Sequence, residues 1–128
     1  MRVTILIAIL GAIGAVSRWK ISEYCTRLGP ENFPFGTFTV NIIGSFLLGI
    51  LMSMSVNETV PETWRVPIAV GFLGSFTTFS TFSVETINLL QQGNGRMALL
   101  NLGSQLGIGL MAAAVGLTIG AALGRMLN

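Results

Sequence analysis

The chain has 128 residues, of which 52% are hydrophobic and only 9% are charged, whereas roughly 25% of the residues in an ordinary soluble domain are charged. It contains no histidine and a single cysteine, Cys25, which excludes an intrachain disulfide framework or multi-cysteine metal site and removes the commonest general base of enzymes. The net charge of +2 is spread singly along the chain and is not gathered into the basic stripe that nucleic-acid binding needs. We therefore expect a protein surrounded by membrane lipid, without nucleic acid as a partner, and not an enzyme.

Four stretches of the chain reach the length of about 20 mostly apolar residues that a membrane-spanning helix needs. The first carries no charge from Val3 to Ser17, and the third is interrupted by Glu85. The apolar start also resembles a secretory signal peptide, but the Ser-Arg-Trp-Lys segment at 17–20 forms a poor cleavage region. We predict an all-α, multi-pass membrane protein with a single transmembrane domain over residues 1–128, whose helices cover residues 3–27, 36–56, 65–92 and 97–126.

Small residues recur at four-residue spacing on three of the predicted helices. In lipid, where packing rather than water exclusion drives association, such stripes let helices approach closely. We therefore interpret them as packing surfaces within a bundle: Ala8 and Ala12, Ser45 and Gly49, Gly103 and Gly107, and Gly116, Gly120 and Gly124.

The basic residues near the helix ends, which usually set the orientation of a membrane protein, are almost equally divided between the two sides. Four crossings place Arg2, Arg65 and Arg125 on one side, and Lys20, Arg27 and Arg96 on the other, with Arg18 deeper on that second side. The near tie permits insertion in either direction, and two oppositely inserted chains can pair about a two-fold axis in the membrane plane. We therefore expect an antiparallel, dual-topology homodimer.

The third stretch holds the strongest functional signal, because from Ser75 to Ser83 every residue is either a hydroxyl donor or a phenylalanine. Gly71 and Gly74, just before this run, weaken the helix at mid-membrane depth. Non-helical backbone at that depth is tolerated only where protein buries it or a cavity wets it, so we predict a break in the third helix and a site beside it. Freed carbonyls at such a break can hold a hard cation such as sodium, while freed amides favour anions.

Phe76, Phe79 and Phe82 recur at every third residue of this run and are expected broadly along one side of a helix, with hydroxyls between them. The positive edge of an aromatic ring can contact an anion without an ionised donor, and Ser and Thr hydroxyls each donate one hydrogen bond. The run therefore predicts an anion track without strongly trapping charges. The alternative is that the rings face lipid and the hydroxyls bond back to their own helix.

Polar side chains on the second and fourth helices are further candidates. The amide of Asn41 has two donors and is costly to leave unpaired in hydrocarbon, so it either serves the same site or forms an interhelical hydrogen bond. Asn101, Ser104 and Gln105 lie at helical spacing for one face of the fourth helix. This cluster either lines a pore or joins helices by hydrogen bonds.

Arg18 and Glu85 are the two charges that cannot easily be placed in open water. An ionisable residue within the membrane is by default a functional hypothesis with a partner to be named. Arg18 either draws anions into a vestibule or pairs with a carboxylate. Glu85 is either that carboxylate or, in the interpretation we prefer, a structural residue at the interface after the third span.

Three parts of the chain carry a family pattern. They are residues 71–85, residues 36–49 with Asn41 and Ser45, and the first-helix residues Gly11, Gly14 and Arg18. Together they resemble the signatures of the fluoride channel family, also called camphor-resistance proteins, over nearly the whole chain. The most specific part is Thr-Thr-Phe-Ser-Thr-Phe at 77–82. The chain departs from the pattern in three places: Ser75, where the family often has a second glycine, and Asn101 and Gln105, where a tyrosine and a serine are frequent.

The resemblance implies an antiparallel, dual-topology homodimer with two separate pores in the bacterial cytoplasmic (inner) membrane, which exports fluoride passively and relieves fluoride toxicity. It also implies a structural sodium ion at the dimer interface, held by the backbone carbonyls of Gly74 and Thr77. By position, it implies that Phe79 and Phe82 line the pores, that Asn41 contributes to fluoride passage, and that Ser80 and Thr81 form a polar track. To these we add two candidates from the preceding paragraphs, namely Ser104 for the pore and Arg18 for an anion vestibule.

A small multidrug exporter is the nearest alternative, because it too is a four-helix, dual-topology dimer of similar length. Export of organic cations by proton exchange needs a membrane-embedded carboxylate, and the first helix has none from Val3 to Ser17. A non-transporting assembly subunit would account for the small-residue stripes but not for the run of hydroxyls and phenylalanines. We therefore favour the channel.

Overall fold

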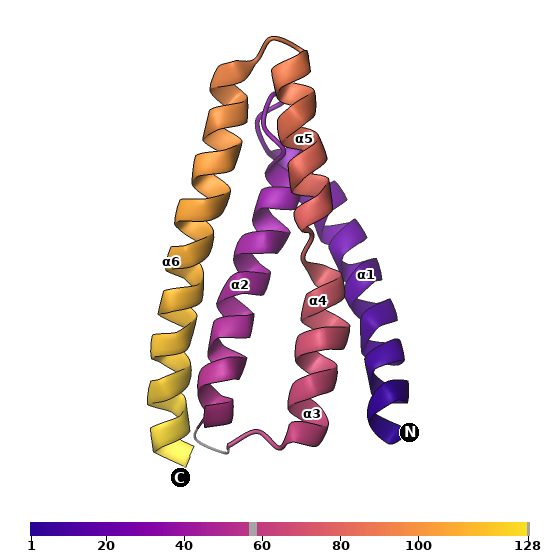
Figure 1. Ribbon diagram of the computed structural model, residues 1–128, viewed down its shortest axis with the longest axis vertical. Coiled ribbons are helices and arrows are strands. Elements are labelled where there is room, and N and C mark those ends of the chain that lie inside the picture. The colour runs from indigo at the N-terminus through magenta and orange to yellow at the C-terminus, as the bar shows by residue number, and fades with distance from the viewer. Residues whose placement is uncertain (57–58, 128) are drawn as a thin grey trace.

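The computed structural model describes residues 1–56 and 59–127, and its regular elements in these ranges are all helices (Figure 1). Four helical spans are long and apolar enough to cross a membrane, the third formed by α3, η1, α4 and α5 in succession. The prediction of an all-helical protein with four membrane-length helices is therefore confirmed. The elements are α1 (Arg2–Leu28), α2 (Phe35–Val56), α3 (Glu62–Val66), the π-helical η1 (Pro67–Leu73), α4 (Gly74–Phe76), α5 (Phe79–Gln91) and α6 (Gly95–Leu127).

The four crossings are arranged with α1 and α6 on opposite sides, and with α2 and the third crossing between them (Figure 1). The helix α2 packs along α6, and α1 packs against η1 and α4. Both chain termini and α3 lie at the same end of the bundle (Figure 1). Arg2, Arg65 and Arg125 therefore belong to one end, as four crossings require, and Arg27 and Arg96 belong to the other.

Glycines allow the close approach of α2 and α6. A Cβ atom at Gly49 would collide with the backbone carbonyl of Ala113, and one at Gly116 would collide with that of Phe46. By contrast, a Cβ at Gly103 or Gly107 would meet no atom within 4 Å in the part of the chain that the structure describes. The stripe that contains Gly116 is therefore a packing surface within the bundle, whereas the stripe of Gly103 and Gly107, which has the same spacing, is not.

We predict that Gly116→Ala destabilises the protein by about 1–3 kcal/mol, the usual cost of forcing extra atoms into a packed core. The added methyl group collides with the α2 backbone, which cannot rotate away as a side chain can. Thermal unfolding in detergent measures the effect. The matched control is Gly95→Ala on the same helix, where the added Cβ has open space; equal melting temperatures for the two variants would contradict this account of the packing.

The third crossing is broken between α4 and α5, as predicted. Thr77 (φ −91°, ψ 160°) and Thr78 (φ −151°, ψ 117°) have extended backbone. The two glycines that led to the prediction are themselves helical: Gly74 has φ −64° and ψ −32°, and Gly71 is buried in η1, where a Cβ would lie 2.8 Å from the carbonyl oxygen of Ile7. Gly71 therefore permits contact with α1, while the break itself consists of two threonines.

Candidate functional site

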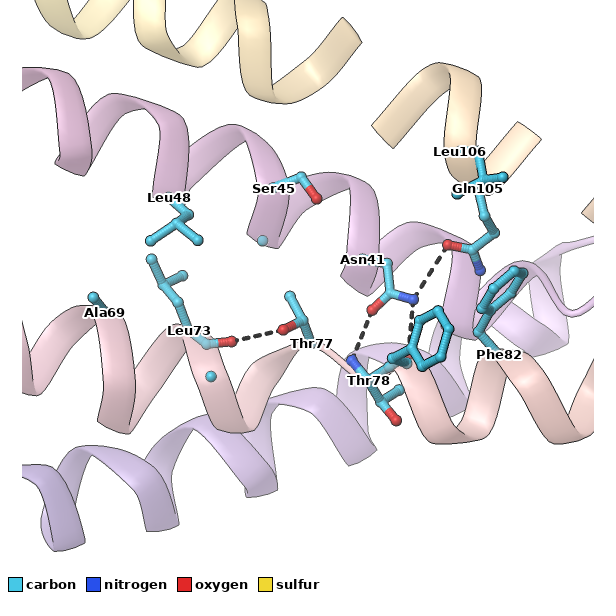
Figure 2. Close-up of a pocket in the computed structure, with 13 residues that line it drawn as sticks. Asn41, Ser45, Leu48, Ala69, Leu73, Thr77, Thr78, Phe82, Gln105 and Leu106 are labelled. Carbon is cyan, nitrogen blue, oxygen red and sulfur yellow. Dashed lines mark hydrogen bonds between the residues drawn. The ribbon is translucent and has the colours of Figure 1, made fainter. Parts of the chain in front are cut away.

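The side chain of Asn41, on α2, holds the broken segment. Its Oδ1 atom accepts a hydrogen bond from the backbone N–H of Thr78 at 2.8 Å, and its Nδ2 atom donates to the backbone carbonyl of Thr78 at 3.0 Å (Figure 2). One side-chain amide thus satisfies both backbone groups of a residue that has left the helix. The sequence left Asn41 with two alternatives, and the structure gives it an interhelical hydrogen bond at the predicted site.

Thr78 also caps the second half of the crossing. Its Oγ1 atom accepts from the backbone N–H of Thr81 at 3.2 Å and donates to the Thr81 hydroxyl at 2.9 Å, while the Ser80 hydroxyl lies 3.2 Å away. A threonine at this position satisfies one of the unpaired donors of a helix start. Ser80 and Thr81 are thereby gathered at the N-terminus of α5, the end of a helix that carries partial positive charge.

The break removes the helical hydrogen-bond donors of several carbonyl groups, among them those of Gly74 and Thr77. In a continuous α-helix the carbonyl of Gly74 would accept from the N–H of Thr78, and that of Thr77 from the N–H of Thr81. Here the first N–H donates to Asn41 and the second to the Thr78 hydroxyl. Gly74 and Thr77 are the two residues expected to hold sodium, and freed backbone carbonyls are the ligands that an unwound membrane helix offers to that ion.

The three phenylalanines do not share one side of a helix, and that expectation is wrong because the break falls between the first and the second of them. Phe76 is 2% exposed and stacks on Phe72 with ring centroids 5.7 Å apart. Phe79 and Phe82 begin the new helix and lie 5.6 Å apart with their rings tilted by 59°. Phe82 is only 6% exposed, whereas Phe79 is 76% exposed in the single chain.

A cavity of about 300 Å³ lies beside the break (Figure 2). Its lining comes from α2, from the third crossing between η1 and α5, and from α6, and it brings together three of the expected pore residues with both expected sodium residues. Those five residues are Asn41, Phe79, Phe82, Gly74 and Thr77.

A second cavity, of about 460 Å³, lies between α1, α2 and α5 and contains Arg18 and Thr81 in its lining. Thr78 lines both cavities. Arg18 and Glu85 form no ion pair in the described part of the chain; the Oε1 atom of Glu85 instead accepts a hydrogen bond from the Thr37 hydroxyl at 2.8 Å. Arg18 is thus placed at a hollow that adjoins the break, without a carboxylate partner among the described residues.

On α6, Gln105 is the member of the polar cluster that reaches the first cavity. Its Oε1 atom accepts from Nδ2 of Asn41 at 3.2 Å. The Ser104 hydroxyl donates to the carbonyl of Asn101 on its own helix at 3.3 Å, and Asn101 is fully buried and donates to the Thr86 hydroxyl at 2.9 Å. Sequence reasoning named all three residues of this cluster and chose Ser104 for the pore, whereas the first cavity is lined by Gln105 and not by Ser104.

Residues 5–117 match the family described as "CrcB-like protein, Camphor Resistance (CrcB)". The chain belongs to this family. Similar relatives include "Fluoride-specific ion channel FluC 2" of Symbiobacterium thermophilum, 45% identical over 83% of this chain and 87% of the relative.

Two other bacterial relatives, both called "Fluoride-specific ion channel FluC", are similar over most of their length. The protein of Magnetococcus marinus is 44% identical over 89% of this chain and 94% of its own. That of Photobacterium profundum is 48% identical over 86% and 87%, respectively. With its four candidate spans and its bacterial relatives, the chain is a multi-pass membrane protein.

Proposed function

We propose that this protein is a fluoride channel, which lets fluoride leave the cell passively across the bacterial cytoplasmic membrane and so relieves fluoride toxicity. The relatives that bear this name support the proposal. The structural observation that carries it is the cavity at the break. There the N-terminus of α5, with the rings of Phe79 and Phe82, lies beside the amide of Asn41 on α2. The rings and the N-terminus of α5 offer positive edges and N–H donors to a small anion without an ion pair that would trap it.

In this proposal fluoride enters through the second cavity, where Arg18 attracts it, and passes the hydroxyls of Ser80 and Thr81 at the start of α5. Thr78 lines both cavities, which supports a path along this side of the break. Phe79 and Phe82 then contact the ion through their edges, and each hydroxyl replaces one hydrogen bond from water. Ser104 remains a predicted pore residue, although its hydroxyl is bonded to its own helix.

The same proposal includes an antiparallel, dual-topology homodimer with two pores. The nearly equal numbers of basic residues at the two ends of the bundle support it. So does the exposure of large apolar side chains around the first cavity, namely Leu48, Phe79 and Leu106. A second chain over this face would cover these side chains and complete the walls around Phe79.

A structural sodium ion at the dimer interface completes the proposal. The carbonyls of Gly74 and Thr77 fit it, because the break has removed their helical donors and leaves two partly negative oxygens at membrane depth. A cation held by these groups from both chains would offset their partial charges and link the two subunits.

Fluoride efflux from liposomes that contain the purified protein tests the proposed function. We expect rapid, electrogenic loss of fluoride when a potassium ionophore supplies the counter-current, and no comparable loss of chloride. Protein-free liposomes are the control. Retention of fluoride by properly reconstituted dimers would contradict the proposal and would redirect the search to proton-coupled export of organic cations.

A further inference from the structure

We propose that the outward face of α1 binds the phosphate of an anionic membrane lipid at Lys20, with Trp19 and Tyr24 on either side of it. The acyl chains of this lipid lie along the apolar residues that precede Lys20 on the same face. The inference goes beyond the proposed function, because it concerns a surface of the bundle that is turned away from the cavity at the break.

The helix α1 turns one face toward the bundle and the opposite face away from it. A Cβ atom at Gly14 would collide with the backbone of Phe72, and one at Gly11 would lie 3.7 Å from the carbonyl oxygen of Gly71. Lys20 follows Gly11 by nine residues, which is two and a half turns of an α-helix with about 3.6 residues per turn. Lys20 therefore lies on the side of α1 opposite the packed glycines.

An apolar stripe leads along this outward face to Lys20. Its members are roughly half exposed, and they are Ile5, Ile9, Ile13 and Val16. Their spacing of three or four residues keeps them on one side of the helix, and Lys20 continues the series four residues after Val16. From Ile9 to Lys20 the helix rises about 16 Å at 1.5 Å per residue, which is close to half of a hydrocarbon core of about 30 Å. A lipid with its chains against this stripe thus has its phosphate at the level of Lys20.

The positive charge of Lys20 is not used within the protein. Its Nζ atom lies 4.2 Å from the centroid of the Trp19 ring, and it forms no ion pair in the described part of the chain. The carboxylate of Glu23 on the same helix is paired with Arg27 at 2.6 Å, and Lys20 does not line the second cavity. An ammonium group at the membrane surface attracts anionic lipid and offers three N–H donors to phosphate oxygens.

Two aromatic side chains flank Lys20 and suit the same boundary. Trp19 is 60% exposed and Tyr24 is 65% exposed. Such residues are enriched where hydrocarbon meets headgroups, because the ring is apolar while its N–H or O–H group is polar. Tyr24 follows Lys20 by four residues and so lies on the same face of α1. The indole N–H and the phenol O–H add two donors beside the ammonium group.

The proposed dimer leaves this face of α1 to lipid and does not cover it with a second copy of the chain. The helices α1 and α6 lie on opposite sides of the bundle (Figure 1). No residue from 2 to 28, a range that the structure describes completely, lines the first cavity, over which the second chain is proposed to lie. The outward face of α1 is therefore at the outside of the dimer.

Quenching of tryptophan fluorescence by brominated lipids tests the inference on the protein in vesicles. The chain has two tryptophans, Trp19 and Trp64, so Trp64→Phe leaves Trp19 as the only emitter. The vesicles are of phosphatidylcholine with the same fraction of either brominated phosphatidylglycerol, which is anionic, or brominated phosphatidylcholine, which has no net charge. We expect the anionic lipid to be favoured beside Trp19 by about fivefold, the attraction that one lysine supplies near anionic lipid.

A pair of single-charge variants, both made in Trp64→Phe, assigns the preference to Lys20. We expect Lys20→Gln to remove it, so that the two brominated lipids quench Trp19 equally. Arg96→Gln is the matched control, because it removes one positive charge at the same end of the bundle but on α6, on the side opposite α1 (Figure 1). It should keep the preference. A preference that survives Lys20→Gln, or that both variants lose alike, would overturn the inference.

Ionic strength gives a readout that needs no change at Lys20. The Debye length falls from about 10 Å in 0.1 M salt to about 3 Å in 1 M salt, so we expect the preference to fall as sodium chloride rises, and quenching by brominated phosphatidylcholine to stay constant. The unaltered protein, in which both tryptophans emit, should show the same trend. A preference that does not depend on salt would contradict a site based on charge.

The same measurement detects a different occupant of this face. If neither brominated lipid quenches Trp19, protein covers α1, and the lipid site is wrong. None of these readouts requires fluoride to cross the membrane, so their failure would leave the proposed function standing, and retention of fluoride in the efflux test would leave the lipid site standing.

Discussion

Replacing both Phe79 and Phe82 by leucine is expected to slow fluoride efflux by roughly a hundredfold, with about tenfold from each single change. Leucine is apolar and buries well, but it has no positive ring edge to offer an anion. The two rings lie 5.6 Å apart at the start of α5, so an ion between α5 and α6 would meet both. Efflux from liposomes, normalised to the amount of reconstituted protein, measures the loss.

The phenylalanine variants need a control for changes in folding. Phe72→Leu provides it, because Phe72 belongs to the same crossing but stacks on Phe76 and does not line the cavity at the break. We expect this variant to conduct normally, and all variants to elute as the same dimer. If Phe79→Leu and Phe82→Leu both conduct at the normal rate, the rings are not part of the pathway.

The number and length of the crossings could be predicted from the sequence because they depend on local composition. An apolar run of sufficient length forms a helix in lipid, whatever it packs against. The third crossing starts at Glu62, not at residue 65. The difference arises because the first residues of α3 are polar, and an argument from hydropathy assigns polar residues to a connector. Such differences at helix ends do not affect the site.

The position of the break could not be read from glycines, because it depends on a partner far away in the sequence. Thr78 leaves the helix where Asn41, 37 residues earlier, satisfies both of its backbone groups. Gly71 and Gly74 signalled that the crossing was unusual, but Gly71 serves a contact with α1. The prediction was therefore right about a break and wrong about the residues that form it.

The choice between Ser104 and Gln105 depended on how α6 is rotated, which packing decides. Gly116 and Gly120 lie against the α2 backbone, and Gln105 precedes Gly116 by eleven residues, which is close to three full turns of an α-helix. Gln105 therefore shares the face of α6 that is turned toward α2, whereas Ser104 is rotated by about 100° from it. This relation was present in the sequence, but the identical spacing of Gly103 and Gly107 concealed which glycines mark the packed face.

Removing sodium is expected to destabilise the dimer. An ion that binds the assembled dimer and not the separate chains stabilises the dimer by mass action, by about 1.4 kcal/mol for each tenfold rise in its concentration above the dissociation constant. The carbonyls of Gly74 and Thr77 lack their helical donors at membrane depth, where unpaired polar groups are costly. Without a cation, each chain would keep these oxygens unpaired, and the interface between the chains would lose the ion that joins them.

Thermal dissociation of the purified dimer, followed at constant ionic strength, measures this effect. We expect the midpoint to rise as sodium replaces N-methylglucamine, an organic cation too large to enter between carbonyl groups, and we expect exchange-sensitive density between Gly74 and Thr77 of the two chains. The proposed sodium site would be contradicted if the midpoint did not change with sodium and the dimer axis showed only water or no density. Because only backbone atoms are proposed as ligands, side-chain substitution cannot remove them. The choice of cation is therefore the sharper variable, and it leaves Phe79, Phe82 and Gln105 unchanged while the site between the chains is tested.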